Sequence, residues 1–255
     1  MPERLKPLEI EELEHIHFER IRYYFLDNFQ EILNGLQSRL EIKNDWYPQF
    51  IATKSNTASD LEMGAERIFH YIFGQGMRSP NSTPIGADLL YETHDAFIHI
   101  DVKTISDSNW NDYKGKIVVE PNQTSYPLSS RGLEPNLPTH YSKTFIREGR
   151  EFKKPCLTYF IYVLHKHASE QIYSILLICM PNGELFNIYG ENILQAGKTK
   201  HNIRYAFKVE PKFKLLSEKR QEELFRIGFL LKSKKYSQED LTGIYGYKIP
   251  VWREL

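Results

Sequence analysis

The sequence predicts one domain of the α/β class. Apolar side chains recur at helical spacing over the first third of the chain, and near residue 87 the period changes to two. Two runs rich in β-branched residues follow, at 157–164 and 172–180. The chain has 255 residues, of which 41% are hydrophobic and 26% charged. This apolar content suffices for a core and excludes disorder as the dominant state.

Helices are predicted in the N-terminal part. Residues 8–43 carry apolar groups at helical spacing, and Gly35 marks the expected break between two helices. Residues 46–50 are expected to form a short aromatic connection. A further helix follows, with Ser59 or Asp60 as its predicted cap and Gly74 and Gly76 at its predicted end.

The rest of the chain is predicted to be mostly strands and loops. A β-hairpin is expected from a strand at 87–91, a turn at 93–95 and a return strand at 96–104. Residues 105–155 are expected to be loops with one short helix near 141–148. The later elements are strands at 157–164, 172–180, 185–189 and 203–209, and a helix at 218–231. The predicted parts of the domain are helices at about 8–76, the sheet at about 85–210, and a C-terminal helix and tail at 215–255.

Charge and cysteine content limit the function classes. Cys156 and Cys179 lie inside apolar runs, which predicts reduced, buried thiols. The N-terminus resembles neither a signal nor a transit peptide, and no apolar run has the length of a membrane span. We therefore expect a cytoplasmic protein without a membrane partner. Residues 1–140 carry eight more acidic than basic side chains and residues 141–255 eight more basic than acidic. Either the two halves pair with each other or the second half offers a polyanion-binding face.

The most informative stretch is the predicted hairpin, because it brings two carboxylates and an ammonium together. Asp88 opens the first strand, and Asp101 lies opposite it on the return strand. Lys103 shares a sheet face with Asp101 because side chains at i and i+2 point the same way. Two carboxylates and the carbonyl of Val102 are suited to one Mg²⁺ ion. Such a site, with a nearby lysine, is what phosphodiester hydrolysis requires.

The Asp-x-Lys triplet alone is not specific. The chain has four other acid-x-Lys triplets, at 41–43, 112–114, 151–153 and 210–212. None of them follows both a hydrophobic strand and an upstream strand that bears Asp. The alternative interpretation is a salt bridge between Asp88 or Asp101 and Lys103 at the end of the sheet.

Asp88 and the triplet Asp101-Val-Lys103, 13 residues later, resemble the core of the PD-(D/E)xK nuclease superfamily. The sequence departs from that pattern at Ala87, which replaces the proline. The resemblance implies a restriction-endonuclease-like core with a mixed central β-sheet flanked by helices, and Mg²⁺, for which Mn²⁺ can substitute. It implies catalytic roles for Asp88, Asp101 and Lys103, and for a glutamate on the preceding helix. Glu66 is the candidate and Glu62 the rival, and either can equally be a solvated helix residue.

The local sequence is also similar to HincII-type restriction endonucleases, through 87–90, 101–104 and 121–126. This resemblance implies a prokaryotic type II restriction endonuclease, a homodimer that cuts both strands of duplex DNA and leaves 5′-phosphate ends. A DNA methyltransferase would be its genetic partner. The residues expected to bind DNA are Asn122, Gln123, Thr124, Ser125, Tyr126, Arg131, Lys198 and Lys200. The amides of Asn122 and Gln123 suit base edges, although the same segment can be a polar turn.

Three questions remain open at the level of sequence. The same nuclease core occurs in junction resolvases, and a DNA-binding module with a vestigial site is a third possibility. The recognition sequence and the position of the cut cannot be read from the residues. We expect the segment 8–43 to contribute to the subunit contact, with core packing as the alternative. The residues concerned are Ile21, Tyr24, Phe25, Phe29 and Leu33.

Overall fold

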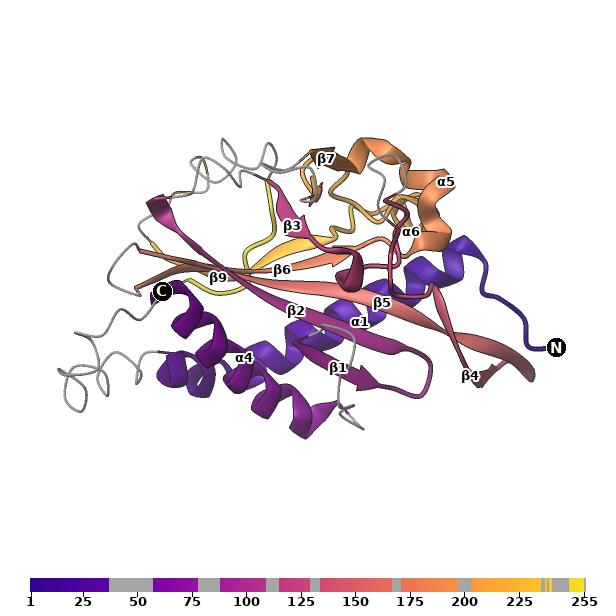
Figure 1. The fold of residues 1–255 in the computed structure, drawn as a ribbon, viewed down its shortest axis with the longest axis horizontal. Coiled ribbons are helices and arrows are strands. Elements are labelled where there is room, and N and C mark those ends of the chain that lie inside the picture. Colours follow the sequence, from indigo (N-terminus) through magenta and orange to yellow (C-terminus); the bar gives the residue numbers. More distant parts are fainter. Residues whose placement is uncertain are drawn as a thin grey trace.

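The computed structural model describes residues 1–36, 57–77, 88–108, 115–128, 134–166, 171–196, 203–234, 237, 239 and 248–254. Its centre is a mixed six-stranded sheet with the order β1-β2-β5-β6-β9, in which β4 also pairs with β5 (Figure 1). Strands β2 and β5 are parallel, and the other pairs are antiparallel. The strands are β1 (Leu89–Glu92), β2 (Phe97–Ser106), β4 (His140–Arg147), β5 (Arg150–His165), β6 (Ile172–Met180) and β9 (Ile227–Lys232). The predicted mixed sheet is confirmed.

Both faces of the central sheet are covered. Helices α1 (Pro7–Asp27) and α4 (Thr57–Gly76) lie on one side in Figure 1. On the other side lies a three-stranded sheet of β3 (Ile117–Val119), β8 (Ile203–Tyr205) and β7 (Leu194–Ala196), with α5 (Phe186–Tyr189) near it. Helix α6 (Lys214–Arg220) packs against α1, since the N–H of Leu216 donates to Glu11 at 2.9 Å. All nine residues of β6 are buried. Near-continuous apolar strands of this kind are typical of a sheet with both faces covered.

A buried ionic cluster fastens α1 to the sheet. The guanidinium of Arg226 is fully buried and pairs with Glu14 at 2.7 Å and with Glu11 at 3.5 Å. The hydroxyl of Tyr189 donates to Glu11 at 2.6 Å, and the backbone N–H of Asn182 donates to Glu14 at 2.7 Å. Buried charges are tolerated when they are paired and hydrogen-bonded in this way.

The helix boundaries differ from the prediction for local reasons. The first break is at Asn28 and not at Gly35, since the Asn28 side chain donates to the carbonyl of Tyr24 and competes with the helix. Gly35 lies within a helical stretch, where a Cβ would come within 3.0 Å of Ile68.

Ser59 and Asp60 lie inside α4 and are not its cap. The helix ends at Gly76 as predicted. The predicted connection at 46–50 lies outside the described residues.

Two segments predicted as helices are strands. Residues 141–147 belong to β4, which connects to β5 through a turn at Glu148 and Gly149. Both have positive φ, 53° and 76°, as a tight hairpin turn requires. The predicted helix at 218–231 is also wrong. Its first residues form the end of α6, which ends where Gln221 adopts the left-handed backbone conformation, and its last residues belong to β9. Pairing with β6 outweighs the helical pattern here.

The remaining strand predictions are partly confirmed. The hairpin of β1 and β2, and strands β5 and β6, occur where expected. Strand β8 covers three residues of the predicted 203–209. The predicted strand at 185–189 is helical, because the Asn182 side chain accepts from the N–H of Glu184 and starts a helical turn. Both cysteines are free and buried, as predicted. Within the described residues, no helix has the length and apolarity to span a membrane.

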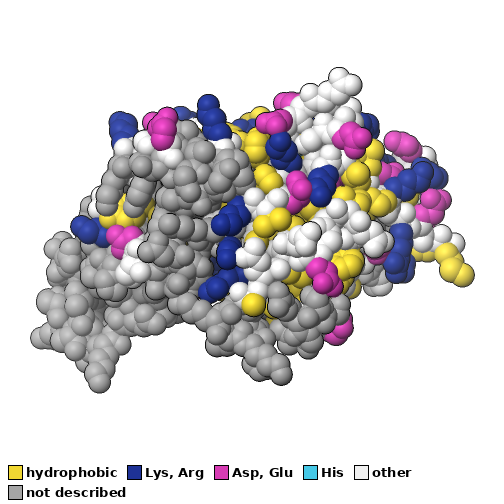
Figure 2. All heavy atoms as spheres, turned by 90° about the horizontal axis from the view of Figure 1, so that it is seen from above, with side chains coloured by type: hydrophobic (Ala, Val, Ile, Leu, Met, Phe, Trp, Pro, Cys, Tyr) yellow, Lys and Arg dark blue, Asp and Glu magenta, His cyan; other side chains and the backbone are white. Residues whose placement is uncertain are grey.

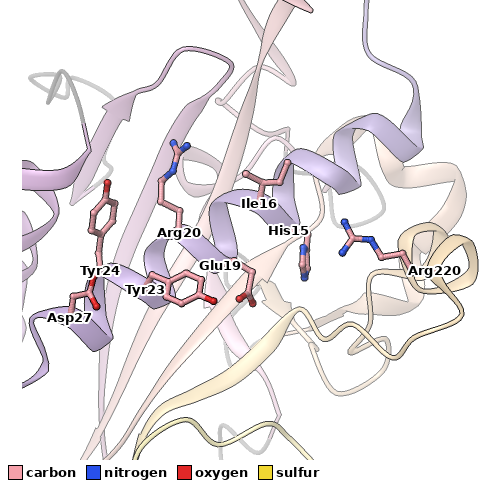
Figure 3. Close-up of a pocket in the computed structure, with 8 residues that line it drawn as sticks. All are labelled: His15, Ile16, Glu19, Arg20, Tyr23, Tyr24, Asp27 and Arg220. Carbon is pink, nitrogen blue, oxygen red and sulfur yellow. The ribbon is translucent and has the colours of Figure 1, made fainter.

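The apolar face of α1 packs into the core of the chain. Phe25 is fully buried and stacks on Phe69 of α4, with ring centroids 6.2 Å apart. Ile21 is also fully buried, and the hydroxyl of Tyr24 donates a hydrogen bond to the carbonyl of Gly76 at 2.6 Å. Ile21 and Phe25 therefore follow the alternative of core packing, and a subunit contact elsewhere in the segment 8–43 stays a prediction. The outer face of α1 instead presents Ile16 and Tyr23, which are 45% and 57% exposed, to an open hollow that reaches Arg220 (Figure 3).

Candidate active site

An offset between β1 and β2 creates the candidate site. β1 begins at Leu89, opposite Ile100, whereas β2 continues to Ser106. Among the described residues, the pairing of β1 with β2 therefore ends at Ile100, and no described strand pairs with the β1 side of residues 101–106. The side chain of Asp88 lies at this edge, since its Oδ2 accepts a hydrogen bond from the backbone N–H of Val102 at 2.6 Å. The N–H and C=O of one strand residue point to the same side, so the carbonyl of Val102 opens on the same edge.

Asp101 and Lys103 lie together on one face of β2, as their spacing predicts. The Nζ of Lys103 is 2.7 Å from the Oδ2 of Asp101. Asp101 is only 1% exposed, and burial raises its pKa to about 7, although the ammonium of Lys103 acts in the opposite direction. Burial also raises the pKa of Asp88. For Lys103, the attraction of Asp101 and the neighbouring carboxylates outweighs burial and raises the pKa.

Gln123 completes the surroundings of Asp101, in a role that the sequence did not suggest. It ends the 3₁₀ turn η2 (Pro121–Gln123) and is 4% exposed. Its Nε2 donates to the Oδ1 of Asp101 at 2.8 Å, and its Oε1 accepts from the N–H of Glu120 at 3.0 Å. Both polar ends of the amide are thus used inside the protein. In this conformation Gln123 is not available to read a base edge.

The three residues after Gln123 are also buried and bonded internally. The hydroxyl of Thr124 accepts from the N–H of Tyr126, and that of Ser125 accepts from the N–H of Gly183. The hydroxyl of Tyr126 donates to the carbonyl of Gly190 at 2.7 Å. Among the residues 122–126, Asn122 alone is partly exposed. The other expected DNA contacts, Arg131, Lys198 and Lys200, lie outside the described residues.

Helix α4 adds two carboxylates, four residues apart on one face of the helix. Burial raises the pKa of Glu66 to about 7, and the charges of Asp88 and Glu62 raise it further. Burial also raises the pKa of Glu62, whose charge acts on Asp88, Asp101 and Lys103. The structure thus brings both the candidate Glu66 and the rival Glu62 towards the site, and Glu62 interacts with more of its members.

The donor set fits a hard divalent cation. Asp88, Asp101, Glu62 and Glu66 are four carboxylates around one ammonium, and burial raises the pKa of each of them. Carboxylate and carbonyl oxygens are the ligands that Mg²⁺ prefers. Among the described residues, no three Asp, Glu, His or Cys side chains converge as a metal site. The ligands that the geometry offers are therefore Asp88, Asp101 and the Val102 carbonyl, with the glutamates acting through their charge.

The surface around the smaller sheet is mixed in charge. Figure 2 shows several Lys and Arg side chains in a row near the middle of this face, with acidic and basic side chains interspersed over the rest. Part of the basic excess of residues 141–255 is neutralised locally, because Lys212 pairs with Glu223 and Lys214 with Glu210. Such exposed pairs contribute little to stability.

Comparisons with known proteins agree with this fold. Residues 6–169 match the family model of the type II restriction enzyme MwoI, N-terminal domain, and residues 172–222 match that of its central domain. The chain is similar to the solved structure of restriction endonuclease BglI bound to its DNA recognition sequence. The TM-score is 0.57 and the identity 16%, over 87% of this chain and 90% of that one.

A second solved structure, tetrameric restriction endonuclease SfiI bound to cognate DNA, gives a TM-score of 0.53 at 16% identity, over 86% of this chain and 85% of that one. No curated protein matches the chain by sequence. The fold expected from the sequence is confirmed by these likenesses. The nearer resemblance to HincII-type enzymes is not confirmed.

Proposed function

The chain belongs to the MwoI family of type II restriction enzymes, and from that premise we propose that it hydrolyses both strands of duplex DNA at a short specific sequence. The proposed reaction depends on Mg²⁺, with Mn²⁺ as a substitute, and leaves 5′-phosphate ends. Asp88, Asp101 and Lys103 carry it. The observation that supports this most is the meeting of these three side chains on β2, just beyond its described pairing with β1.

Each residue has a separate task in the proposed site. Asp88, Asp101 and the carbonyl of Val102 would hold the cation, which when bound polarises the phosphate and lowers the pKa of water. The ammonium of Lys103 faces the same point and can orient the attacking water or stabilise the additional negative charge on the phosphate. The carboxylates Glu62 and Glu66 strengthen the negative potential that attracts the cation.

The DNA partner is inferred from the related structures. BglI and SfiI were solved bound to DNA, and this chain shares their fold. We assign base contact within the segment 121–126 to Asn122, because its side chain is the one left partly exposed. Arg131, Lys198 and Lys200 remain candidates for contacts to phosphate, which supply most of the sequence-independent affinity.

The assembly and the genetic context follow from the reaction. Cutting both strands with one site per chain requires two sites related by a two-fold axis, which a homodimer supplies. A host that contains the enzyme needs a methyltransferase to protect its own copies of the recognition site. We therefore propose a homodimer and a cognate DNA methyltransferase as its partners.

Incubation of the full chain with long duplex DNA and Mg²⁺ tests this proposal. Discrete fragments that appear only with the metal are expected. Preferential cutting of a four-way junction would instead support a resolvase, and DNA binding without cutting a vestigial site. A methyltransferase encoded beside this gene would support the first outcome.

A further inference from the structure

The amide of Gln123 has only one orientation that satisfies both of its neighbours. Glu120 presents a backbone N–H, which requires an acceptor, and Asp101 presents a carboxylate oxygen, which requires a donor. The amide oxygen must therefore face Glu120 and the amide nitrogen must face Asp101. Because the side chain is almost fully buried, water does not compete for either contact.

Asp101 is held at both of its oxygens by different parts of the chain. Lys103 of the same strand pairs with Oδ2, and Gln123 of η2 donates to Oδ1. A carboxylate rotates readily about its terminal torsion angle, and a single contact to a flexible lysine leaves much of that freedom. A second donor on the opposite oxygen fixes the plane of the carboxylate.

The segment that carries Gln123 is itself anchored to the central sheet. Two residues after Gln123, the Ser125 hydroxyl accepts from the N–H of Gly183 at 3.1 Å. The side chain of the preceding Asn182 donates to the carbonyls of Thr139 and Cys156, the latter at 2.8 Å in β5. Gln123 is thus a support for Asp101 that does not depend on β2.

We propose that Gln123 is a positioning residue, which orients the Asp101 carboxylate so that the lone pairs it leaves free face the cation shared with Asp88. This inference rests on the proposed metal site at Asp101. Groups that hydrogen-bond to metal-binding carboxylates orient them, and their loss typically weakens metal affinity or activity about 10- to 100-fold.

Calorimetric titration of Mn²⁺ into the full chain tests the proposal without relying on cleavage. Gln123→Met keeps the length of the side chain but removes both hydrogen bonds, and we expect about 10- to 100-fold weaker Mn²⁺ binding. Gln123→Asn keeps an amide but is one methylene too short to reach Asp101, and its loss of Mn²⁺ affinity should be of the same size. The matched control is Gln171→Met, which makes the same change at an exposed site. It should bind Mn²⁺ as the wild-type chain does.

A double-mutant cycle shows whether Gln123 acts through Asp101. In an Asp101→Asn background, Gln123→Met should cause no further loss of Mn²⁺ affinity. The Gln123 variants should also cut DNA more slowly in Mg²⁺, with unchanged DNA affinity in EDTA and an unchanged circular dichroism spectrum.

Two results would overturn the positioning role alone. One is wild-type Mn²⁺ affinity in the folded Gln123→Met and Gln123→Asn chains. The other is a loss of equal size in the Asp101→Asn background, which would mean that Gln123 acts elsewhere. Absence of Mn²⁺ binding by the wild-type chain would instead overturn the proposed metal site itself, and this inference with it.

Discussion

The carboxylate of Asp88 accepts a hydrogen bond from the backbone N–H of Val102, 14 residues further along the chain, at 2.6 Å. The bond ties the residue before β1 to the middle of β2. It also holds the Asp88 carboxylate beside Asp101 and Lys103 of β2. The end of one short strand thereby places the three residues on which the proposed reaction depends.

Removal of the Lys103 ammonium should stop catalysis without unfolding the protein. Lys103 is near the surface and pairs with Asp101 alone among the ion pairs described. Lys103→Met should reduce the cleavage rate about 100- to 1,000-fold, the usual effect of losing one group that stabilises transition-state charge. DNA affinity in EDTA should be little changed. Lys153→Met, on β5, is the control, and a cleavage rate equal to that of the control would make Lys103 structural.

Replacement of Asn122 tests base readout in the segment 121–126. If its exposed amide contacts a base edge, Asn122→Ala should lose about 1–3 kcal/mol of discrimination between the cognate site and a single-base variant. Binding to unrelated DNA should not change, since phosphate contacts supply it. Competition binding assays measure both quantities, with Asn34→Ala on an exposed helical site as the control. Equal discrimination by both variants would place readout elsewhere.

The packing of Phe25 predicts loss of stability and not a soluble monomer. Phe25→Ala leaves a cavity beside Phe69, and such changes cost about 3–5 kcal/mol in the free energy of unfolding. Urea unfolding measures this cost. Sedimentation of the wild-type chain should show a species of about twice its mass of 30.1 kDa. A Phe25→Ala chain that is fully stable but monomeric would return this residue to the subunit contact.

The buried ionic cluster predicts how stability varies with pH. Burial raises the pKa of Glu14 to about 7, with Arg226 opposing the shift and Glu11 adding to it. Between its ordinary value of 4.5 and about 7, the folded chain holds a proton that the unfolded chain has lost. The contribution of Glu14 to the free energy of unfolding therefore falls as pH rises through this range, by at most about 1.4 kcal/mol per unit.

Urea unfolding of the wild-type chain and of Glu14→Gln at pH 5, 6, 7 and 8 measures this contribution. The slope of the free energy of unfolding against pH should differ between the two chains, and the difference is due to Glu14 alone. The other titrating groups are common to both chains, including Glu11, which faces Arg226 from the same helix. If the free energies of unfolding of the two chains change in parallel from pH 5 to pH 8, Glu14 is ionised in the folded chain over that whole range.

The parts of the site that are close in sequence were predictable. Asp88, Asp101 and Lys103 lie on one hairpin, and its alternating pattern fixed both the pairing and the face. The residue type of Gln123 predicts DNA readout, because an amide suits a base edge. Its contact with Asp101 depends on how the segment 115–128 folds back over the sheet, which local sequence does not encode.

The errors in secondary structure have the same origin. Residues 141–147 and 227–231 have patterns compatible with a helix, and form strands because β5 and β6 pair with them. Arg226 illustrates the limit for charged residues. Its isolated position in the sequence gives no sign that Glu11 and Glu14, more than 200 residues earlier, pair with it in the core.

The most direct measurement is cleavage and binding by Asp101→Asn alongside the wild-type chain, on the same long duplex DNA. Asn keeps the size of the side chain and removes the charge that a cation needs. The wild-type chain should produce discrete fragments in Mg²⁺ and none in EDTA. Asp101→Asn should produce none in either, while it shifts the DNA in a gel as the wild-type chain does in EDTA. The same fragments at the same rate from Asp101→Asn would contradict the assignment of the active site.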